Sequence, residues 1–310
     1  MSNGVEAEAR FAVKLMRGAG PATLALVLAT GSSAEAQPLP AGEGAVTVWY
    51  ERATSSEHLN REGQADRLGS ELFHVVFGDV DYGLTDRLTV GGTLVWLGTE
   101  WNGPEHLSHG PIDTGEFHYS LQDVRLDARY SADVRSVTVT PFISLGTPTR
   151  DYEVRGHSAF GRGLADTQVG VGFGGSVGRA GYLYSSVAYA FVERVDDAPY
   201  DMDRINGELE FGHGVGAGLW ARGVFTWQIM RDGLELGPQT EHFELREIHD
   251  RLARASYTQL GGSLAIPLGG RFELEAGGFG TLTGRNFHKV VAFVSALTWR
   301  FGGGLQVVGP

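Results

Sequence analysis

The chain has 310 residues with no cysteine, 46 glycines and a formal net charge of −12. The lack of cysteine excludes a disulfide framework, a thiolate metal site and a cysteine nucleophile. The negative charge argues against nucleic acid as a partner, because phosphate binding needs a cationic surface. The glycine content is too high for a typical globular enzyme and favours a protein with many tight turns and closely spaced strands.

The first 36 residues are typical of an export signal. Arg17 precedes an apolar run over residues 22–29, and Ala34-Glu35-Ala36 gives the small-x-small pattern of a cleavage site. Met16 is an alternative translation start within this segment. No later segment has the roughly 18 to 20 apolar residues of a spanning helix, so a mature chain in a membrane would cross it as strands.

After a short linker over residues 37–43, alternation of apolar and polar side chains predicts strands along the rest of the chain. Two of them lie within residues 117–144, on either side of a polar turn at residues 131–135. The other ten are predicted over residues 44–52, 69–84, 88–100, 164–177, 182–195, 204–212, 217–230, 255–266, 271–282 and 287–301.

Strand length and loop order favour a membrane barrel over a soluble sandwich. Most of the predicted strands have 9 to 16 residues, whereas soluble strands have about 5 to 6 and tilted membrane strands need about 9 to 11. The connections alternate long and short, as in a barrel with short periplasmic turns and longer outer loops. We therefore predict an all-β fold, a transmembrane up-and-down antiparallel β-barrel of about 12 strands over residues 44–301 in the outer membrane, followed by an extension over residues 302–310.

Aromatic residues recur near the predicted strand ends, where membrane interfaces favour them. The predicted interface residues are Trp49, Tyr50, Tyr82, Trp96, Tyr130, Tyr182 and Trp299.

The stretch from residue 120 to residue 130 shows how such a strand divides its faces. One face carries the charged residues at positions 123, 125, 127 and 129, and the other carries Gln122, Val124, Leu126, Ala128 and Tyr130. A charge facing lipid at mid-membrane costs about 2 to 4 kcal/mol for Arg or Lys, so charged faces are expected to line the lumen. The predicted lumen residues are Asp123, Arg125, Asp127, Arg129, Glu208, Glu210, Arg222, Glu273 and Glu275. Such charges fit either a constriction that selects solutes or a closed interior of paired charges, and the sequence leaves both open.

Short motifs then suggest a family. They are the turn DYGLTDRL at residues 81–88, the Thr140-Pro141-Phe142 step with GTPTRDY at residues 146–152, and GLADTQVG at residues 163–170. On these motifs the chain resembles the outer-membrane proteins grouped as the "MetA-pathway of phenol degradation" family, in the wider class of hydrophobic-solute channels. The resemblance implies an exported barrel that moves small, often apolar molecules, with no catalytic residues to carry over. One departure is that nine residues follow Phe301, where many outer-membrane barrels end on an aromatic residue.

Two glycine motifs and two groups of histidines are candidate binding or catalytic sites. Residues 170–175 match G-x-G-x-x-G and residues 174–178 match G-x-S-x-G. Dinucleotide sites and nucleophile elbows require a helix directly after such a motif. Both motifs instead lie in a predicted strand that a tight turn joins to another strand. Imidazole and carboxylate groups that suit Zn²⁺ occur in two predicted loops, as His106 and His109 and as His242, Glu244, Glu247 and His249. Solvated loop side chains are the preferred interpretation, so no metal site, cofactor or catalytic residue is predicted.

The function predicted from the sequence is passive passage of small molecules, including apolar or aromatic ones, through a charged lumen. Two alternatives stay open: a non-conducting barrel that acts as scaffold or adhesin through its outer loops, and a lipid hydrolase sited at the rim. The expected partners are the outer-membrane bilayer and a small-molecule solute, with no nucleic acid, and the sequence sets neither the solute nor the oligomeric state.

Overall fold

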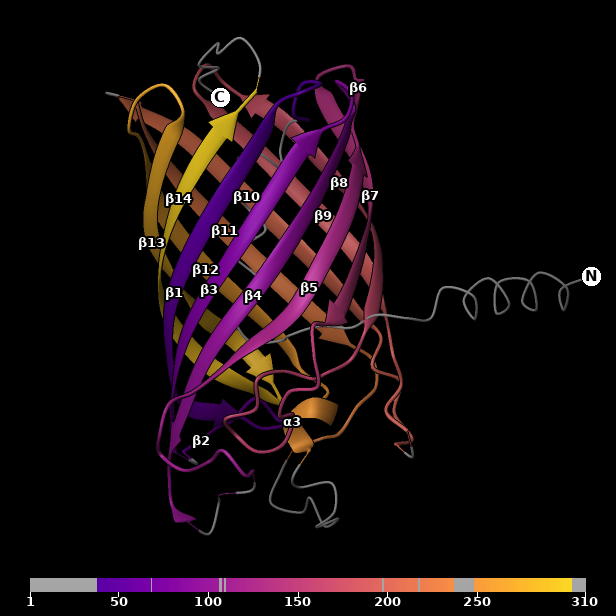
Figure 1. Cartoon of the computed structure of the whole chain (residues 1–310), viewed down its shortest axis with the longest axis vertical. Helices are drawn as coiled ribbons and strands as arrows, with labels where there is room; N and C mark the ends of the chain where they lie inside the picture. The colour runs from indigo at the N-terminus through magenta and orange to yellow at the C-terminus, as the bar shows by residue number, and fades with distance from the viewer. Residues whose placement is uncertain are drawn as a thin grey trace, which may run out of the picture.

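The computed structural model describes residues 38–67, 69–105, 108, 110–196, 198–216, 218–236 and 248–302. These residues form one barrel of antiparallel strands that closes because the last strand pairs with the first (Figure 1). The predicted signal peptide over residues 1–36 lies outside the described residues, as does most of the predicted extension after Phe301.

Within the described ranges, twelve strands of 12 to 16 residues make the wall of the barrel. They are β1 (Gly44–Leu59), β3 (Ser70–Gly83), β4 (Leu88–Asn102), β5 (His118–Tyr130), β7 (Val137–Pro148), β8 (Asp166–Val177), β9 (Gly181–Val192), β10 (Arg204–Gly216), β11 (Leu219–Met230), β12 (Ser256–Pro267), β13 (Phe272–Arg285) and β14 (Phe287–Phe301). Two short strands, β2 (Ala65–Asp66) and β6 (Ala132–Val134), pair with β1 and β7, and one helical turn, α3 (His249–Leu252), lies among the loops. The predicted all-β fold with twelve barrel strands is confirmed.

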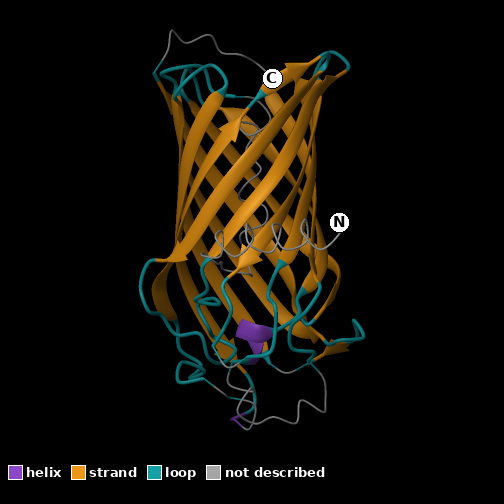
Figure 2. Ribbon diagram, turned by 90° about the vertical axis from the view of Figure 1, so that its right-hand side faces the viewer, coloured by secondary structure: helices purple, strands orange, loops and turns teal. Residues whose placement is uncertain are grey.

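The two ends of the barrel differ. Short turns join the strands at the end where β14 finishes, and long loops with α3 occupy the opposite end (Figure 2). An exception at the long-loop end is the turn from β13 to β14, where Asn286 alone separates the strands and adopts a φ of 50°. We call the two ends the short-turn end and the long-loop end.

The strands alternate between an apolar outer face and a more polar inner face. Large apolar side chains are exposed around the outside, among them Val48, Trp96, Leu126, Leu209, Ile229 and Val291. An exposed apolar surface that continues around a whole barrel is the surface a bilayer covers. Among the described residues, no helix is long and apolar enough to cross a membrane.

The first strand is longer than predicted. Residues 53–59 were expected to begin a long loop, but β1 continues to Leu59 because this segment keeps its pairing with β14 on one side and, as far as Ser55, with β3 on the other. The small side chains of Ala53 and Ser55 are buried on the inner face. Neighbouring strands therefore extend a segment whose composition indicated a loop.

A β-bulge in β5 corrects the predicted division of its faces. Leu94 pairs with Val124 and Trp96 pairs with Leu121, so Gln122 and Asp123 lie together opposite a single residue of β4. A bulge inserts one extra residue and shifts the alternation. Gln122, predicted on the apolar outer face, is consequently buried on the inner face.

The predicted interface aromatics divide into two groups. Trp49 and Tyr182 are 4% and 7% exposed and lie on the inner face, so the prediction is wrong for these two. Alternation along one strand does not reveal the register between strands, and this register fixes which of the two alternating sets of side chains faces inward. Tyr50 lies on the outer face, where its hydroxyl is 2.7 Å from Nδ1 of His74. The remaining four, for which an interface position stays a prediction, are exposed: Tyr82, Trp96, Tyr130 and Trp299.

Candidate functional site: the lumen and its lid

One side of the inner surface is apolar. On the neighbouring strands β13, β14, β1, β3 and β4, inward side chains form a buried cluster that includes Trp49, Phe73, Phe77, Val95, Leu97, Phe279, Val290 and Val294. We call these residues the apolar wall. An apolar inner face is unusual for a water-filled barrel, whose interior is generally polar.

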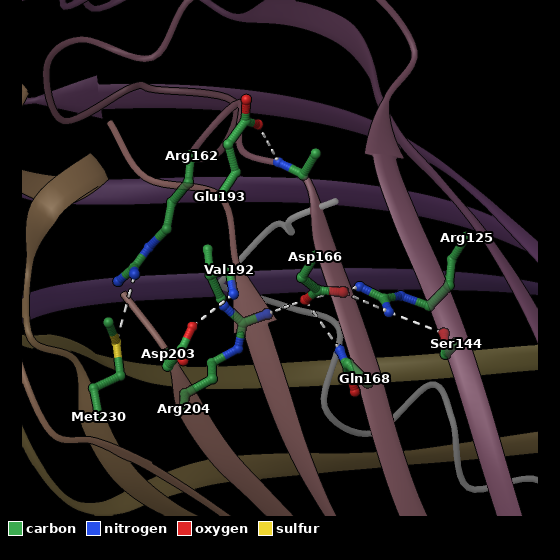
Figure 3. A network of polar contacts seen from close by, with 11 residues as sticks. Arg125, Ser144, Arg162, Asp166, Gln168, Val192, Glu193, Asp203, Arg204 and Met230 are labelled. Atoms are coloured by element: carbon green, nitrogen blue, oxygen red, sulfur yellow. Dashed lines mark hydrogen bonds and ion pairs between the residues drawn. The ribbon is translucent and has the colours of Figure 1, made fainter. Parts of the chain in front are cut away.

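The opposite side of the inner surface carries linked charges. The carboxylate of Asp166, at the start of β8, is fully buried and accepts hydrogen bonds from Nη1 of Arg125 at 3.1 Å and Nη2 of Arg204 at 2.5 Å (Figure 3). Nε2 of Gln168 lies 3.2 Å from the same carboxylate. One aspartate thus joins arginines from β5 and β10 across the strands between them.

Further ion pairs lie toward the short-turn end. Arg129 pairs with Asp81 of β3 and, at 3.0 Å, with Asp127 of its own strand. Arg222 of β11 pairs with Glu275 of β13 and lies 3.0 Å from Glu273. These pairs reach across neighbouring strands on the inner face and neutralise much of the charge there.

The structure places all nine predicted lumen residues on buried or half-buried inner positions. It brings Asp127 together with Arg129, and Arg222 together with Glu273 and Glu275. The others have partners elsewhere: Asp123 accepts a hydrogen bond from the Tyr152 hydroxyl at 2.6 Å, Arg125 pairs with Asp166, and Glu210 accepts one from Tyr182. Glu208 is also buried on this face. That these residues line a conducting pore stays a proposal.

Sequence reasoning missed several inner charges. Glu51, Glu71, Asp79, Asp81, Asp166 and Arg204 face inward, so with the nine predicted residues the described wall strands carry at least eleven inward carboxylates and four inward arginines. A signal was present for Asp166 and Gln168, which alternate with Thr167 and Val169 at the start of their strand. Acidic groups therefore outnumber basic ones on this face.

Some inner polar atoms have no protein partner among the described residues. They include both carboxylate oxygens of Glu51, the side-chain amide atoms of Gln259 and the hydroxyl of Thr226, each at most 1% exposed. Buried polar groups are nearly always hydrogen-bonded, to protein or to water. The described side chains supply no partner for these atoms, so water or a bound solute would have to satisfy them.

A loop folds into the barrel from the long-loop end. Tyr152 and Phe160, from the segment between β7 and β8, are buried against the apolar wall. Nε2 of Gln122 donates a hydrogen bond to the Phe160 carbonyl, and the Tyr152 hydroxyl bonds to Asp123. The bulge in β5 thus presents two adjacent polar side chains that anchor this loop.

A second segment closes over the first. Residues 231–236 and 248–255, which include α3, pack with Leu164, Met202 and Phe287 in a separate buried cluster. We call this segment, together with residues 150–163, the lid. The loops and α3 lie together at the long-loop end of the barrel in both views (Figures 1 and 2).

Buried arginines and one asparagine hold the lid together. Arg162 donates to the carbonyl of Ala253 at 2.8 Å, and Nε of Arg251 donates to the carbonyl of Arg162 at 2.8 Å. Arg162 is 2% exposed, and this burial lowers its pKa to about 9. Asn286 accepts a hydrogen bond from the amide of Leu236 at 2.8 Å and so ties the lid to the turn between β13 and β14.

The predicted glycine motifs take no part in this site. Residues 170–175 and 174–178 lie in β8, which continues through a turn into β9. No helix follows them, so neither a dinucleotide site nor a nucleophile elbow is formed there.

The predicted metal-ligand groups are only partly described. His106, His109, His242, Glu244 and Glu247 lie outside the described residues. His249 is the first residue of α3 and lies among histidines from other parts of the chain, which sequence spacing could not indicate.

Comparison with known proteins gives a likeness in fold. No family model and no curated protein sequence matches the chain. Among solved structures, the COG4313 outer membrane channel from Pseudomonas putida F1 superposes with a TM-score of 0.69 at 14% identity, over 87% of this chain and all of that one. The translocator domain of the autotransporter NalP from Neisseria meningitidis gives a TM-score of 0.51 at 12% identity, over 96% and 98% of the two chains. The fold is therefore that of outer-membrane β-barrels, and the channel class that the motifs resemble has a member of the same fold.

Proposed function

We propose that this protein is an outer-membrane channel for small molecules, with the lid closing its outer mouth in the conformation described here. The termini of the barrel lie at the short-turn end, which faces the periplasm in barrels of this type, and the long loops face outward. The observation that carries the proposal is the inner surface, where unpartnered polar atoms lie beside an apolar wall.

The two kinds of inner surface favour a particular class of solute. An apolar wall gives contact to a hydrocarbon or aromatic body, and the acidic surplus attracts a positive charge. Small neutral or cationic molecules with an apolar body fit both surfaces. The matched structure from Pseudomonas putida is described as a channel, which supports transport but not this choice of solute.

The packed lid also favours the second candidate, a non-conducting barrel. Most inner charges are paired, and the lid is held by at least two buried clusters and several hydrogen bonds. A channel function requires that the lid moves aside, so the experiment must release it.

The deciding experiment is single-channel recording in planar bilayers with the wild-type protein and Arg162→Ala. Arg162→Ala removes a buried guanidinium that bonds the two parts of the lid, and we expect it to raise the open probability at least ten-fold. Arg155→Ala is the matched control, because Arg155 lies in the same loop but pairs with Glu153 at the surface. We expect cation-selective conductance steps from the wild-type protein and from Arg162→Ala.

The result that would refute the channel is silence from both wild type and Arg162→Ala, with insertion confirmed by protease protection and by heat-dependent electrophoretic mobility. The scaffold candidate would then stand. Steps that favour anions would keep the channel and reject the proposed solute class.

A further inference from the structure

Four histidines from distant parts of the sequence meet where the lid contacts the barrel wall. His58 lies next to the end of β1 and His288 next to the start of β14, so both belong to the wall at the long-loop end. His249 belongs to α3, and His157 belongs to the loop that enters the barrel. All four side chains are buried, with exposures of 6% to 8%.

Asp250 of α3 lies at the centre of this cluster. Its carboxylate is within 4.8 Å of ring nitrogens of His58 and His288 on one side, and of His157 and His249 on the other. The rings of His58 and His288 stack with centroids 4.5 Å apart, and those of His157 and His249 meet edge to face at 5.1 Å. One carboxylate thus has imidazoles from four separate parts of the chain near it.

One ring nitrogen of the cluster makes no hydrogen bond to the described residues and could act as a metal ligand. Nε2 of His58 is buried and has no hydrogen-bond partner among the described residues. An orphaned buried imidazole nitrogen is costly unless something binds it. A neighbouring cavity of about 70 Å³ is lined by His157, Asp250 and His288, so there is room for a small species beside the cluster.

The side chains of the cluster offer the atoms that metals of this class prefer. Imidazole nitrogens and carboxylate oxygens are among the ligands that Zn²⁺ takes from proteins.

A second carboxylate supports one of the candidate ligands from behind. Nδ1 of His288 lies 2.7 Å from a carboxylate oxygen of Glu71, while Nε2 of the same ring lies 3.7 Å from Asp250. Metal-bound histidines commonly donate their other ring nitrogen to a carboxylate, which fixes the tautomer and the ring orientation. Glu71 is placed to be the carboxylate that accepts this hydrogen bond from His288.

We propose that His58, His288 and Asp250 bind a divalent transition metal ion of the Zn²⁺ type that fastens the lid to the barrel wall. These three ligands, from wall and lid, lie within reach of one ion. Three protein ligands leave the fourth position of a tetrahedral Zn²⁺ site to water or a solute. The proposal stands apart from the channel function, since a barrel that never conducts could hold the metal equally well.

The test is Zn²⁺ binding to untagged protein purified from the outer membrane and stripped with EDTA. Isothermal titration and elemental analysis after dialysis should give one Zn²⁺ per chain. His58→Gln and His288→Gln should each lower the affinity at least ten-fold, and Glu71→Gln should lower it about 10- to 100-fold because ligand orientation is lost. Zn²⁺ should also raise the unfolding temperature of wild type and leave that of His58→Gln unchanged.

Two controls separate this site from other histidines. His213→Gln changes an exposed histidine near the short-turn end and should leave the affinity unchanged. The triple variant His106→Gln/His109→Gln/His242→Gln removes the loop histidines and should also bind one Zn²⁺. Heat-dependent mobility in electrophoresis establishes that each variant is folded. Wild type that binds no Zn²⁺, or binding that survives in folded His58→Gln and His288→Gln, would overturn the proposal.

Discussion

The fully buried carboxylate of Asp166 offers a direct measure of how much water reaches the charged side of the lumen. Asp166→Asn keeps the shape of the side chain but removes its charge, leaving Arg125 and Arg204 facing a neutral amide. Removing one partner of a buried ion pair typically costs about 3 to 5 kcal/mol, because the remaining charge is left uncompensated. Two guanidiniums share this partner, so we expect a loss in the upper half of that range.

Reversible urea unfolding in lipid vesicles, followed by tryptophan fluorescence, gives the free energy of unfolding. Glu193→Gln is the control, since this exposed carboxylate accepts a hydrogen bond from the Ala165 amide that a glutamine can also accept. It should change the free energy of unfolding by less than about 0.5 kcal/mol. Replacing the three charged residues together with Leu and Met should restore most of the loss, as apolar substitution of buried ion networks often does. A loss below about 1 kcal/mol for Asp166→Asn would refute the reasoning and show that water screens the network.

Three other perturbations test separate features. Phe160→Ala should destabilise the protein by about 3 to 5 kcal/mol, measured by the same unfolding assay, because the ring is buried against the apolar wall; a loss no larger than that of an exposed phenylalanine would contradict the lid packing. Gly207→Ala should lower the free energy of unfolding by about 1 to 3 kcal/mol, since its Cβ would lie 1.9 Å from the Trp227 ring. Gly223→Ala is the control, because its Cβ meets nothing within 4 Å, and it should cost less stability. Equal losses would show that the tryptophan moves freely. Glu273→Lys should reduce cation selectivity, measured as the reversal potential in a salt gradient, because Glu273 keeps more exposure than its partner Arg222; an unchanged potential would place Glu273 away from the ion path.

Much of the candidate site could be foreseen as a set of inward charges, but not as contacts. The face of Arg125 follows from local alternation, whereas its partner Asp166 lies 41 residues further along the chain. The same holds for Arg222 and Glu273, which are 51 residues apart. Sequence periodicity reports which side of a strand a residue takes, and pairing across a barrel depends on the order and register of strands.

The errors have the same origin. Gln122 was placed outside because alternation was counted through a bulge, and Trp49 was placed at the membrane surface because aromatic residues fit both an interface and an apolar inner wall. The polar composition of residues 53–59 predicts a loop, yet pairing with β14 extends β1 through them. In each case a neighbouring strand overrode a local signal.

The sequence by itself determined the barrel: strands of membrane length, alternation with apolar outer faces, and loops that alternate in length. These properties are local, because each strand must satisfy the lipid on one side wherever it stands in the sheet. Only the tertiary structure decided that loops fold inward as a lid and that His58, His157, His249 and His288 surround Asp250. Closure of β1 against β14 brings residues 58 and 288 together, and loops carry no periodicity from which such a meeting could be inferred.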